Sequence, residues 1–537
     1  MKKTLETRRY LTPFNSRALP HLFTDVLVIG GGVAGLRAAI AATEFGSVAV
    51  VAKKPLTESN TAEAQGGIAA AMSPGDSVDL HVADTLATGT GICDEEMVRL
   101  IVGEGPARVG ELITWGAKFD HKNGEIEFTT EGGHSIARIL HARGDATGAE
   151  IAHTLAAKAR SIGAIQLLED HYVVDLLTTD GRAAGAVVHS PTRGMMLLWA
   201  SQVVLATGGI GRLYRETTNP PAATGDGLAM AWRAGAVLHD LEFVQFHPTT
   251  LYVAGAGRTL VSETVRGEGG WLLNRMGERF MPKYHADAEL APRDVVSRAI
   301  LHEIQETGFP CVYLDVRRID ADHLRTRFPA IYRACLSFDI DITKDLIPVR
   351  PSAHYYIGGV KVDALGRTSV PGLFAVGEVA CSGFHGANRL GSNSLLEGLV
   401  LGARAGRQAG EDFTAGPHDG HPHALASRIE EPKRGEIDLG DVENSLRALM
   451  WCAAGIERDQ AHLETAEDYV DFWCGYVLDK AFSDTHGWTI QNMLTVAKLV
   501  IHAARERCES RGVHFRTDYP NRDDERWKRH LTIQRGG

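Results

Sequence analysis

A short run of β-branched residues near the N-terminus, Val26 to Ile29, is typical of a buried strand. The next stretch, Leu36 to Phe45, has the composition of a helix, and Ser47 to Ala52 has that of a second strand. The glycine-rich segment between the first strand and the helix, residues 30–35, fits the pattern G-x-G-x-x-G. In this frame, the glycines let backbone amides reach a pyrophosphate at the start of the helix. The pattern therefore predicts a dinucleotide-binding unit.

This unit departs from the usual nicotinamide-binding pattern. An acidic residue is expected about 20 residues further on, where it binds a ribose hydroxyl. The chain has Ala52, Lys53 and Lys54 there instead. A lysine suits a phosphate or a ribose hydroxyl, but an ordinary NAD site is disfavoured.

Two later segments are predicted to return to the same sheet, and their spacing defines the domains. "SQVVLATGGIG" (201–211) and "GLFAVGEVA" (372–380) are both strands that end in glycines. After residue 425, apolar residues at three- and four-residue spacing predict helices, and "AGPHDGHPHALASR" is the predicted linker. We therefore predict an α/β chain with an N-terminal tail, a Rossmann-like dinucleotide domain, an inserted α+β domain and a C-terminal helical domain. Their ranges are, in that order, 1–24, 25–240 with 356–425, 241–355, and 426–537.

The bulk composition excludes several classes of protein. A chain of 537 residues is long enough for two or three domains. Its net charge of −11 disfavours a nucleic-acid partner, which needs a basic face. No apolar run approaches the roughly 20 residues of a membrane span, and the basic N-terminus lacks the apolar region of a secretory signal, so we expect a loosely ordered tail. The seven cysteines contain no C-x-x-C, which favours a reducing cytoplasm and argues against a metal site.

A series of motifs then carries a family resemblance. The segments "GGGVAGL", "SNTAEAQGGIAAA", "QFHPT", "RGEGG", "HYYIGGV" and "HGANRLGSNSLLE" stand in the same order as in the succinate dehydrogenase/fumarate reductase flavoproteins. The chain resembles this superfamily from residue 25 to 530, and within it most resembles the branch that oxidises L-aspartate. The resemblance implies FAD, a capping domain inserted into the FAD domain, and a C-terminal helical bundle.

The resemblance also implies a set of cofactor-binding residues. They are Gly30, Gly31, Gly32, Val33, Ala34, Gly35, Lys53, Asn60, Thr61, Ala62, Glu63, Ala64, Gln65, Gly66, Gly67, Val173, Asp226, Glu378, Ser394 and Leu395. Gly66 and Gly67 are expected to let the backbone approach the flavin, and Glu378 to bind a ribose hydroxyl. Members that attach FAD covalently have histidine in "S-H-T", whereas Asn60 stands here in "S-N-T". Noncovalent FAD is therefore expected.

The same resemblance places four basic residues and two neighbours at the substrate. These are His247, Arg293, His354 and Arg389, with Ser262 and Glu263 as further substrate contacts. Guanidinium groups bind carboxylates with two parallel hydrogen bonds, so this set suits a dicarboxylate held at both ends. The family gives Arg293 an acid/base role. A guanidinium is a poor base, and a purely electrostatic role fits equally well; the two histidines have the more convenient pKa range for proton transfer.

A single acid stands among cations in "FTTEGGHSIARILHARGDATG" (128–148). Glu131 matches a carboxylate of the aspartate-oxidising branch, where it would pair with the substrate ammonium group and help to remove its proton. Succinate and fumarate have no ammonium group. The alternative is that Glu131 neutralises Arg138 or Arg143.

The resemblance therefore implies a cytoplasmic enzyme that oxidises L-aspartate to iminosuccinate by hydride transfer from Cα to flavin N5. Oxygen or fumarate would accept the electrons, and the next enzyme of NAD synthesis is a candidate for functional coupling. Two other functions stay open: a fumarate reductase or succinate dehydrogenase flavoprotein subunit, and a non-catalytic flavin-binding scaffold. The C-terminal stretch "ESRGVHFRTDYPNRDDERWKRH" keeps the first of these open, because its second half looks as much like the succinate dehydrogenases.

Overall fold

The predicted dinucleotide-binding sheet is confirmed in the computed structural model, which describes residues 8–415, 423–429 and 436–536. Its parallel strands are β9 (Ile165–Leu168), β3 (Val48–Val51), β2 (His21–Ile29), β12 (Gly194–Leu205) and β19 (Leu373–Ala375). β19 pairs with the end of β12, so the chain does return to this sheet after residue 370. β10 (Tyr172–Thr179) and β11 (Arg182–Ser190) extend it in antiparallel fashion.

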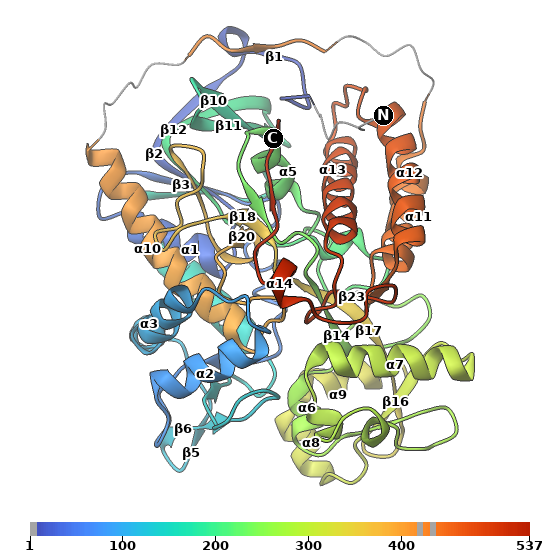
Figure 1. The fold of residues 1–537 in the computed structure, drawn as a ribbon. Coiled ribbons are helices and arrows are strands. Elements are labelled where there is room, and N and C mark those ends of the chain that lie inside the picture. The colour runs from blue at the N-terminus through green and yellow to red at the C-terminus, as the bar shows by residue number, and fades with distance from the viewer. Residues whose placement is uncertain (1–7, 416–422, 430–435, 537) are drawn as a thin grey trace.

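Helices pack against this sheet and against one another. α1 (Val33–Ala42) packs along α10 (Asn393–Ala415), and the two lie side by side in Figure 1. The other helices of this part are α2 (Val78–Thr88), α3 (Glu95–Thr114), α4 (Thr147–Arg160) and α5 (Asp226–Arg233). Short strands β4 (Ile68–Ala69), β7 (Phe128–Thr129) and β8 (Ile139–Leu140) form a separate small sheet beside them.

The inserted segment forms its own α+β unit with its own core, at the lower right of Figure 1. Its antiparallel sheet has the order β14 (Val244–Leu251), β17 (Ile347–Tyr356), β16 (Val312–Asp315) and β15 (Trp271–Leu273). Its helices are α6 (Glu263–Gly267), α7 (Arg293–Thr307), α8 (Ala321–Arg327) and α9 (Pro329–Leu336). The predicted α+β character is confirmed, whereas the exact domain boundaries stay a prediction.

The C-terminal part begins as three helices and then changes character. α11 (Leu439–Ala453), α12 (Gln460–Val477) and α13 (Thr485–Glu506) stand together at the upper right of Figure 1. After α13 the chain turns back, with β23 (Phe515–Arg516), the short α14 (Asp524–Trp527) and β24 (Thr532–Ile533). β24 pairs with β13 (Leu238–His239), which also pairs with β18 (Gly359–Lys361), and β18 pairs with β20 (Ala380–Cys381). The helical description therefore fits residues 439–506 but not the final segment.

The expectation of a loosely ordered N-terminal tail is wrong for residues 8–20. Leu11 and Phe14 are buried in a small core beside β10 to β12. β1 (Phe14–Asn15) pairs with β21 (Ala426–Ser427), so this segment lies against the end of the predicted linker. Packing of these apolar side chains outweighs the polar composition around them. Residues 1–7 and half of the predicted linker, 416–422, lie outside the described residues.

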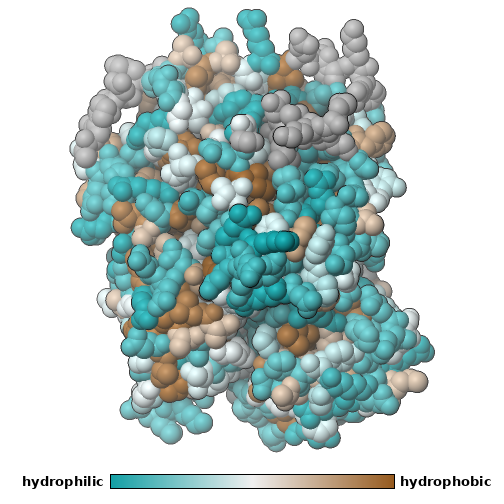
Figure 2. Space-filling view, in the orientation of Figure 1, coloured by the Kyte–Doolittle hydropathy of each residue, from teal (hydrophilic) through white to brown (hydrophobic). Residues whose placement is uncertain are grey.

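Figure 2 shows a mainly hydrophilic face on which the hydrophobic patches are small and separated. Within residues 8–415, 423–429 and 436–536, no helix combines the length and the apolar character that crossing a bilayer requires. The same residues contain no cluster of three His, Cys, Asp or Glu side chains placed to hold a metal ion. All seven cysteines are free thiols.

Candidate active site

A cavity of about 790 Å³ opens at the carboxyl ends of the parallel strands. Ile29, Val51, Ala206 and Val376 line it, and each lies at the end of β2, β3, β12 or β19 or directly after it. This is the edge at which open parallel sheets bind their ligands. All the predicted cofactor residues except Gly35 and Ala62 line the cavity, as do all seven predicted substrate and catalytic residues.

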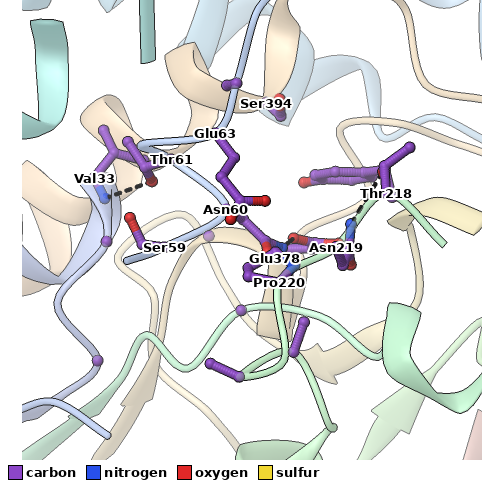
Figure 3. A pocket seen from close by; sticks show the side chains of 18 of the residues that line it. Val33, Ser59, Asn60, Thr61, Glu63, Thr218, Asn219, Pro220, Glu378 and Ser394 are labelled. Carbon is purple, nitrogen blue, oxygen red and sulfur yellow. Dashed lines mark hydrogen bonds between the residues drawn. The ribbon is translucent and has the colours of Figure 1, made fainter. Parts of the chain in front are cut away.

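The glycine-rich turn brings the start of α1 to the cavity wall. Gly30 has φ +120°, and a Cβ atom there would lie 2.0 Å from the carbonyl oxygen of Ala206. Gly35 does not line the cavity; a Cβ on it would lie 2.0 Å from Gly30 O, so its role is close packing of the helix on the turn. The backbone N–H of Val33 donates to Thr61 Oγ1 at 3.0 Å (Figure 3), which ties the "SNTAEAQGG" segment to the helix start.

At one end of the cavity, Asp226 is the centre of a buried polar network. Lys53 Nζ lies 2.9 Å from Asp226 Oδ2, while Tyr172 Oη and Asn492 Nδ2 donate to Oδ1 at 3.0 and 2.8 Å. Burial alone would raise the pKa of Asp226, but Lys53 lowers it below its usual value. Asn492 lies on α13 and does not line the cavity, so the C-terminal helices support Asp226 from behind the cavity wall. The sequence reasoning missed Asn492, although the adjacent amides of Gln491 and Asn492 interrupt an apolar helix.

Near the middle of the cavity, Glu378 is held by two donors. Asn60 Nδ2 donates to its Oε2 at 3.0 Å (Figure 3), and the backbone N–H of Tyr356 donates to Oε1 at 2.9 Å. Burial raises the pKa of Glu378 to about 7. A Cβ on Gly67 would lie 2.1 Å from Ile139 Cγ2, so packing against β8 already requires this glycine. The expected approach of the backbone to the flavin at Gly67 stays a prediction, and packing gives this glycine a second reason.

The cavity also contains buried polar atoms that a ligand would satisfy. Among the described residues, Gln65 Oε1 and Thr207 Oγ1 have no hydrogen-bond partner, and both side chains line the cavity. Buried polar atoms of folded proteins are nearly always paired. Together with the helix N-terminus and Lys53, these atoms fit a long ligand that carries phosphate and other polar groups.

The two predicted arginines meet at one amide. Arg293, the first residue of α7, donates from Nη1 to Gln245 Oε1 at 3.1 Å, and Arg389 donates from Nε to the same oxygen at 3.2 Å. Arg389 also donates to Ser394 Oγ at 2.9 Å and lies 4.4 Å from the ring centre of Tyr355. Burial lowers the pKa of Arg389 to about 10, and Arg293 adds to the effect. Two buried guanidinium groups in one cavity favour an anionic ligand.

Gln245 was missed by the sequence reasoning, although alternation along the strand would have found it. Gln245 and His247 are two residues apart on β14, and side chains two apart point to the same face of a strand.

Glu263 compensates part of this positive charge. Its Oε2 accepts from Arg293 Nε at 2.6 Å, and its Oε1 lies 3.6 Å from Arg266 Nη2. Burial favours the neutral form of Glu263, but Arg293 and Arg266 lower its pKa below the usual value. Ser262 caps α6, and its hydroxyl lies 3.1 Å from Thr264 Oγ1. Arg266 was not predicted; it is buried behind the cavity and does not line it.

The two histidines are neutral in this environment. Burial lowers the pKa of both well below the usual value; Arg293 adds to the effect on His247, and Arg389 to that on His354. In this environment both imidazoles are therefore weaker bases than the sequence alone suggests. His354 Nδ1 lies 2.9 Å from Thr218 Oγ1, and the backbone N–H of Thr249 donates to His247 Nδ1 at 3.2 Å. These contacts leave Nε2 as the nitrogen available to the cavity.

Glu131 lies in this cavity with little solvent exposure, 4%. Ser392 Oγ donates to Oε2 at 2.8 Å and Thr264 Oγ1 to Oε1 at 3.3 Å. Arg138 pairs instead with Asp76 at 3.0 Å, and Arg143 with Glu150 at 2.7 Å. The hypothesis that Glu131 neutralises either arginine is therefore wrong, and in the part of the chain that the structure describes no side-chain cation forms an ion pair with it.

Comparison with known proteins identifies the family. The FAD binding domain family matches residues 25–395, and the fumarate reductase flavoprotein C-terminal family matches residues 480–536. L-Aspartate oxidase of Streptomyces coelicolor is 43% identical over 95% of this chain and 91% of its own. L-Aspartate oxidase of Pseudomonas aeruginosa is 41% identical over 93% and 96%. The chain belongs to the L-aspartate oxidase family. Its cofactor is FAD, which fits the cavity described above.

Solved structures of related proteins share this fold. A mutant of E. coli quinol fumarate reductase FrdA superimposes with a TM-score of 0.88 at 34% identity, over 96% of this chain and 94% of that one. Mycobacterium smegmatis Sdh1 in complex with UQ1 gives a TM-score of 0.82 at 35% identity, over the same shares. The resemblance to the succinate dehydrogenase/fumarate reductase flavoproteins is therefore confirmed, as is the expected architecture of an FAD domain with capping and C-terminal helical parts.

Proposed function

We propose that the chain oxidises L-aspartate to iminosuccinate at this cavity, as the first step of NAD synthesis. The observation that carries the proposal is Glu131, a buried carboxylate without an ion-pair partner among the described residues, in the same cavity as Arg293 and Arg389. A substrate with two carboxylates and one ammonium group complements that arrangement of charge. A dicarboxylate without the ammonium group leaves Glu131 uncompensated, which is costly for a buried anion.

Each side chain then has a part in binding or proton transfer. Arg389 and Arg293 bind the carboxylates, and Gln245 accepts a hydrogen bond from both guanidinium groups at one oxygen. Glu131 binds the ammonium group and helps to remove its proton. FAD, when bound, supplies the two-electron oxidation. His247 and His354, being neutral, are able to accept a proton, whereas we assign Arg293 an electrostatic role because its Nε is committed to Glu263.

The test is a reduction experiment under anaerobic conditions. We expect L-aspartate to bleach the visible absorbance of the FAD-loaded protein, with reoxidation by oxygen or by fumarate. Bleaching by succinate but not by L-aspartate would favour the alternative of a fumarate reductase or a succinate dehydrogenase subunit. The fold similarity to FrdA and Sdh1 is the observation behind that alternative. Bleaching by neither would favour the flavin-binding scaffold.

We also propose that FAD is held noncovalently. Asn60 offers no nucleophilic imidazole, and its amide nitrogen is engaged by Glu378. Acid precipitation of the holoenzyme is therefore expected to leave the yellow colour in the supernatant. Absorbance that stays with the washed polypeptide would contradict this prediction.

Two further expectations complete the proposal. A cytoplasmic location agrees with seven free thiols. Functional coupling to the next enzyme of NAD synthesis stays a prediction.

A further inference from the structure

The carboxylate of Glu131 is fixed by two hydroxyl groups from distant parts of the chain. Ser392 follows the "GANRLG" turn before α10, and Thr264 lies in the first turn of α6. Each donates to a different oxygen, Ser392 at 2.8 Å and Thr264 at 3.3 Å. Ser392 and Thr264 are 7% and 2% exposed, so water does not easily replace either donor. The shorter contact makes Ser392 the stronger of the two restraints.

The backbone of Ser392 is unusual for a residue with a side chain. Its φ is +61°, in the left-handed region that costs a non-glycine residue conformational energy. The backbone is held there because Ser392 O accepts from the N–H of Ala69 at 3.0 Å. Glycine would adopt this conformation without the cost. Strained conformations of this kind cluster at functional sites, where the surrounding structure maintains them.

The neighbouring glycine shows how tightly the carboxylate is enclosed. A Cβ atom on Gly391 would lie 2.7 Å from Glu131 Oε2 and 3.1 Å from Arg293 Nη2. The carboxylate and the guanidinium thus approach the same point, yet they form no ion pair in the described structure. Ser392 holds Oε2 by a neutral donor at this point, which keeps the negative charge of Glu131 available.

We propose that Ser392 is a positioning residue that aims the carboxylate of Glu131 at the substrate ammonium group and so contributes to selectivity for an amino acid over a plain dicarboxylate. This inference rests on the proposed function. Thr264 is the second, weaker support of the same carboxylate. Ser392 acts through Glu131, so removal of its hydroxyl has no effect on a ligand that does not need Glu131.

The test uses Ser392→Gly, which removes the hydroxyl and relieves the backbone at the same time. We expect kcat/KM for L-aspartate to fall about 10- to 100-fold, as for the loss of one hydrogen bond to a charged acceptor. Fumarate reduction by the same FAD-loaded variant, driven by a reduced dye, is expected to change less than about twofold. Ser392→Ala keeps the strained backbone and is expected to give the same selective loss. Ser190→Ala, at a buried serine on β11 that does not line the cavity, is the control.

A double-mutant cycle with Glu131→Gln separates the possible outcomes. If Ser392 acts through Glu131, Ser392→Gly has little further effect on L-aspartate in the Glu131→Gln background. Equal losses for L-aspartate and fumarate, full additivity in the cycle, or an unchanged Ser392→Gly enzyme would each overturn the inference. A Glu131→Gln enzyme that keeps full activity on L-aspartate would overturn the inference together with the role of Glu131, whereas failure of L-aspartate to bleach the unsubstituted protein would refute the proposed function. A selective Glu131→Gln effect with a harmless Ser392→Gly would refute only the role of Ser392.

Discussion

Glu131→Gln is expected to lower kcat/KM for L-aspartate by about two to four decades. Glutamine keeps the size and the hydrogen-bond acceptor for Ser392 but removes the charge that only the ammonium group needs. Removing one partner of a buried ion pair costs roughly 3–5 kcal/mol, and each decade corresponds to about 1.4 kcal/mol. The measurement is steady-state oxidation of L-aspartate by purified, FAD-loaded variant.

The same preparation supplies the control, because fumarate reduction needs no ammonium group. It is expected to be unchanged or faster, since a repulsive anion has been removed from a cavity that binds a dicarboxylate. Losses of similar size for L-aspartate and fumarate would eliminate amine recognition by Glu131. A variant that fails to retain FAD would indicate a structural role instead.

Arg389→Leu is expected to weaken L-aspartate and fumarate alike. Arg389 is 4% exposed, and its guanidinium is fixed by Gln245, Ser394 and the ring of Tyr355. We expect the loss of a desolvated charge pair to cost roughly 3–5 kcal/mol, again about two to four decades in kcat/KM for each substrate. The measurement is the ratio of the two losses, which should be close to one.

Two further variants serve as controls for the Arg389→Leu experiment. Arg389→Lys keeps a charge without the planar pair of donors, and is expected to recover only part of the activity. Arg325→Leu removes a half-exposed arginine on α8, outside the cavity, and is expected to leave both activities unchanged. Unchanged kinetics of Arg389→Leu for both substrates would remove Arg389 from the site.

The fold was predictable because local patterns report it directly. The strand, the glycine turn and the helix at residues 26–45 carry period and composition, and the structure confirms them as β2 and α1. The point at which the C-terminal helices end, Glu506, was harder to predict from the sequence. The final segment after Glu506 contains mostly polar residues and pairs with β13 through β24. No hydrophobic periodicity in this segment predicts that pairing.

The site was predictable only in part. His247, Arg293, His354 and Arg389 come from four separated segments, so motif resemblance and not spacing brings them together. Charge proximity along the chain was misleading for Glu131, because Arg138 and Arg143 find other partners in Asp76 and Glu150.

The lowered pKa of the two histidines could not be predicted from the sequence either. It depends on burial and on neighbouring guanidinium groups, which are properties of the folded chain. Ser392 and Thr264, which donate to Glu131, likewise stand in no sequence pattern that would have predicted this contact.

The return of the chain terminus has a consequence for biosynthesis. Asn492 donates to Asp226, which stands 266 positions earlier in the chain. β24, close to the C-terminus, pairs with β13 at Leu238–His239. Contacts between residues so far apart form late, because a long loop must close first. On the ribosome, neither contact can be made until nearly the whole polypeptide has emerged. The nucleotide-binding sheet is translated early, but Asp226 gains its hydrogen bond from Asn492 only at the end, so a prematurely terminated chain lacks one of the donors that hold this buried carboxylate.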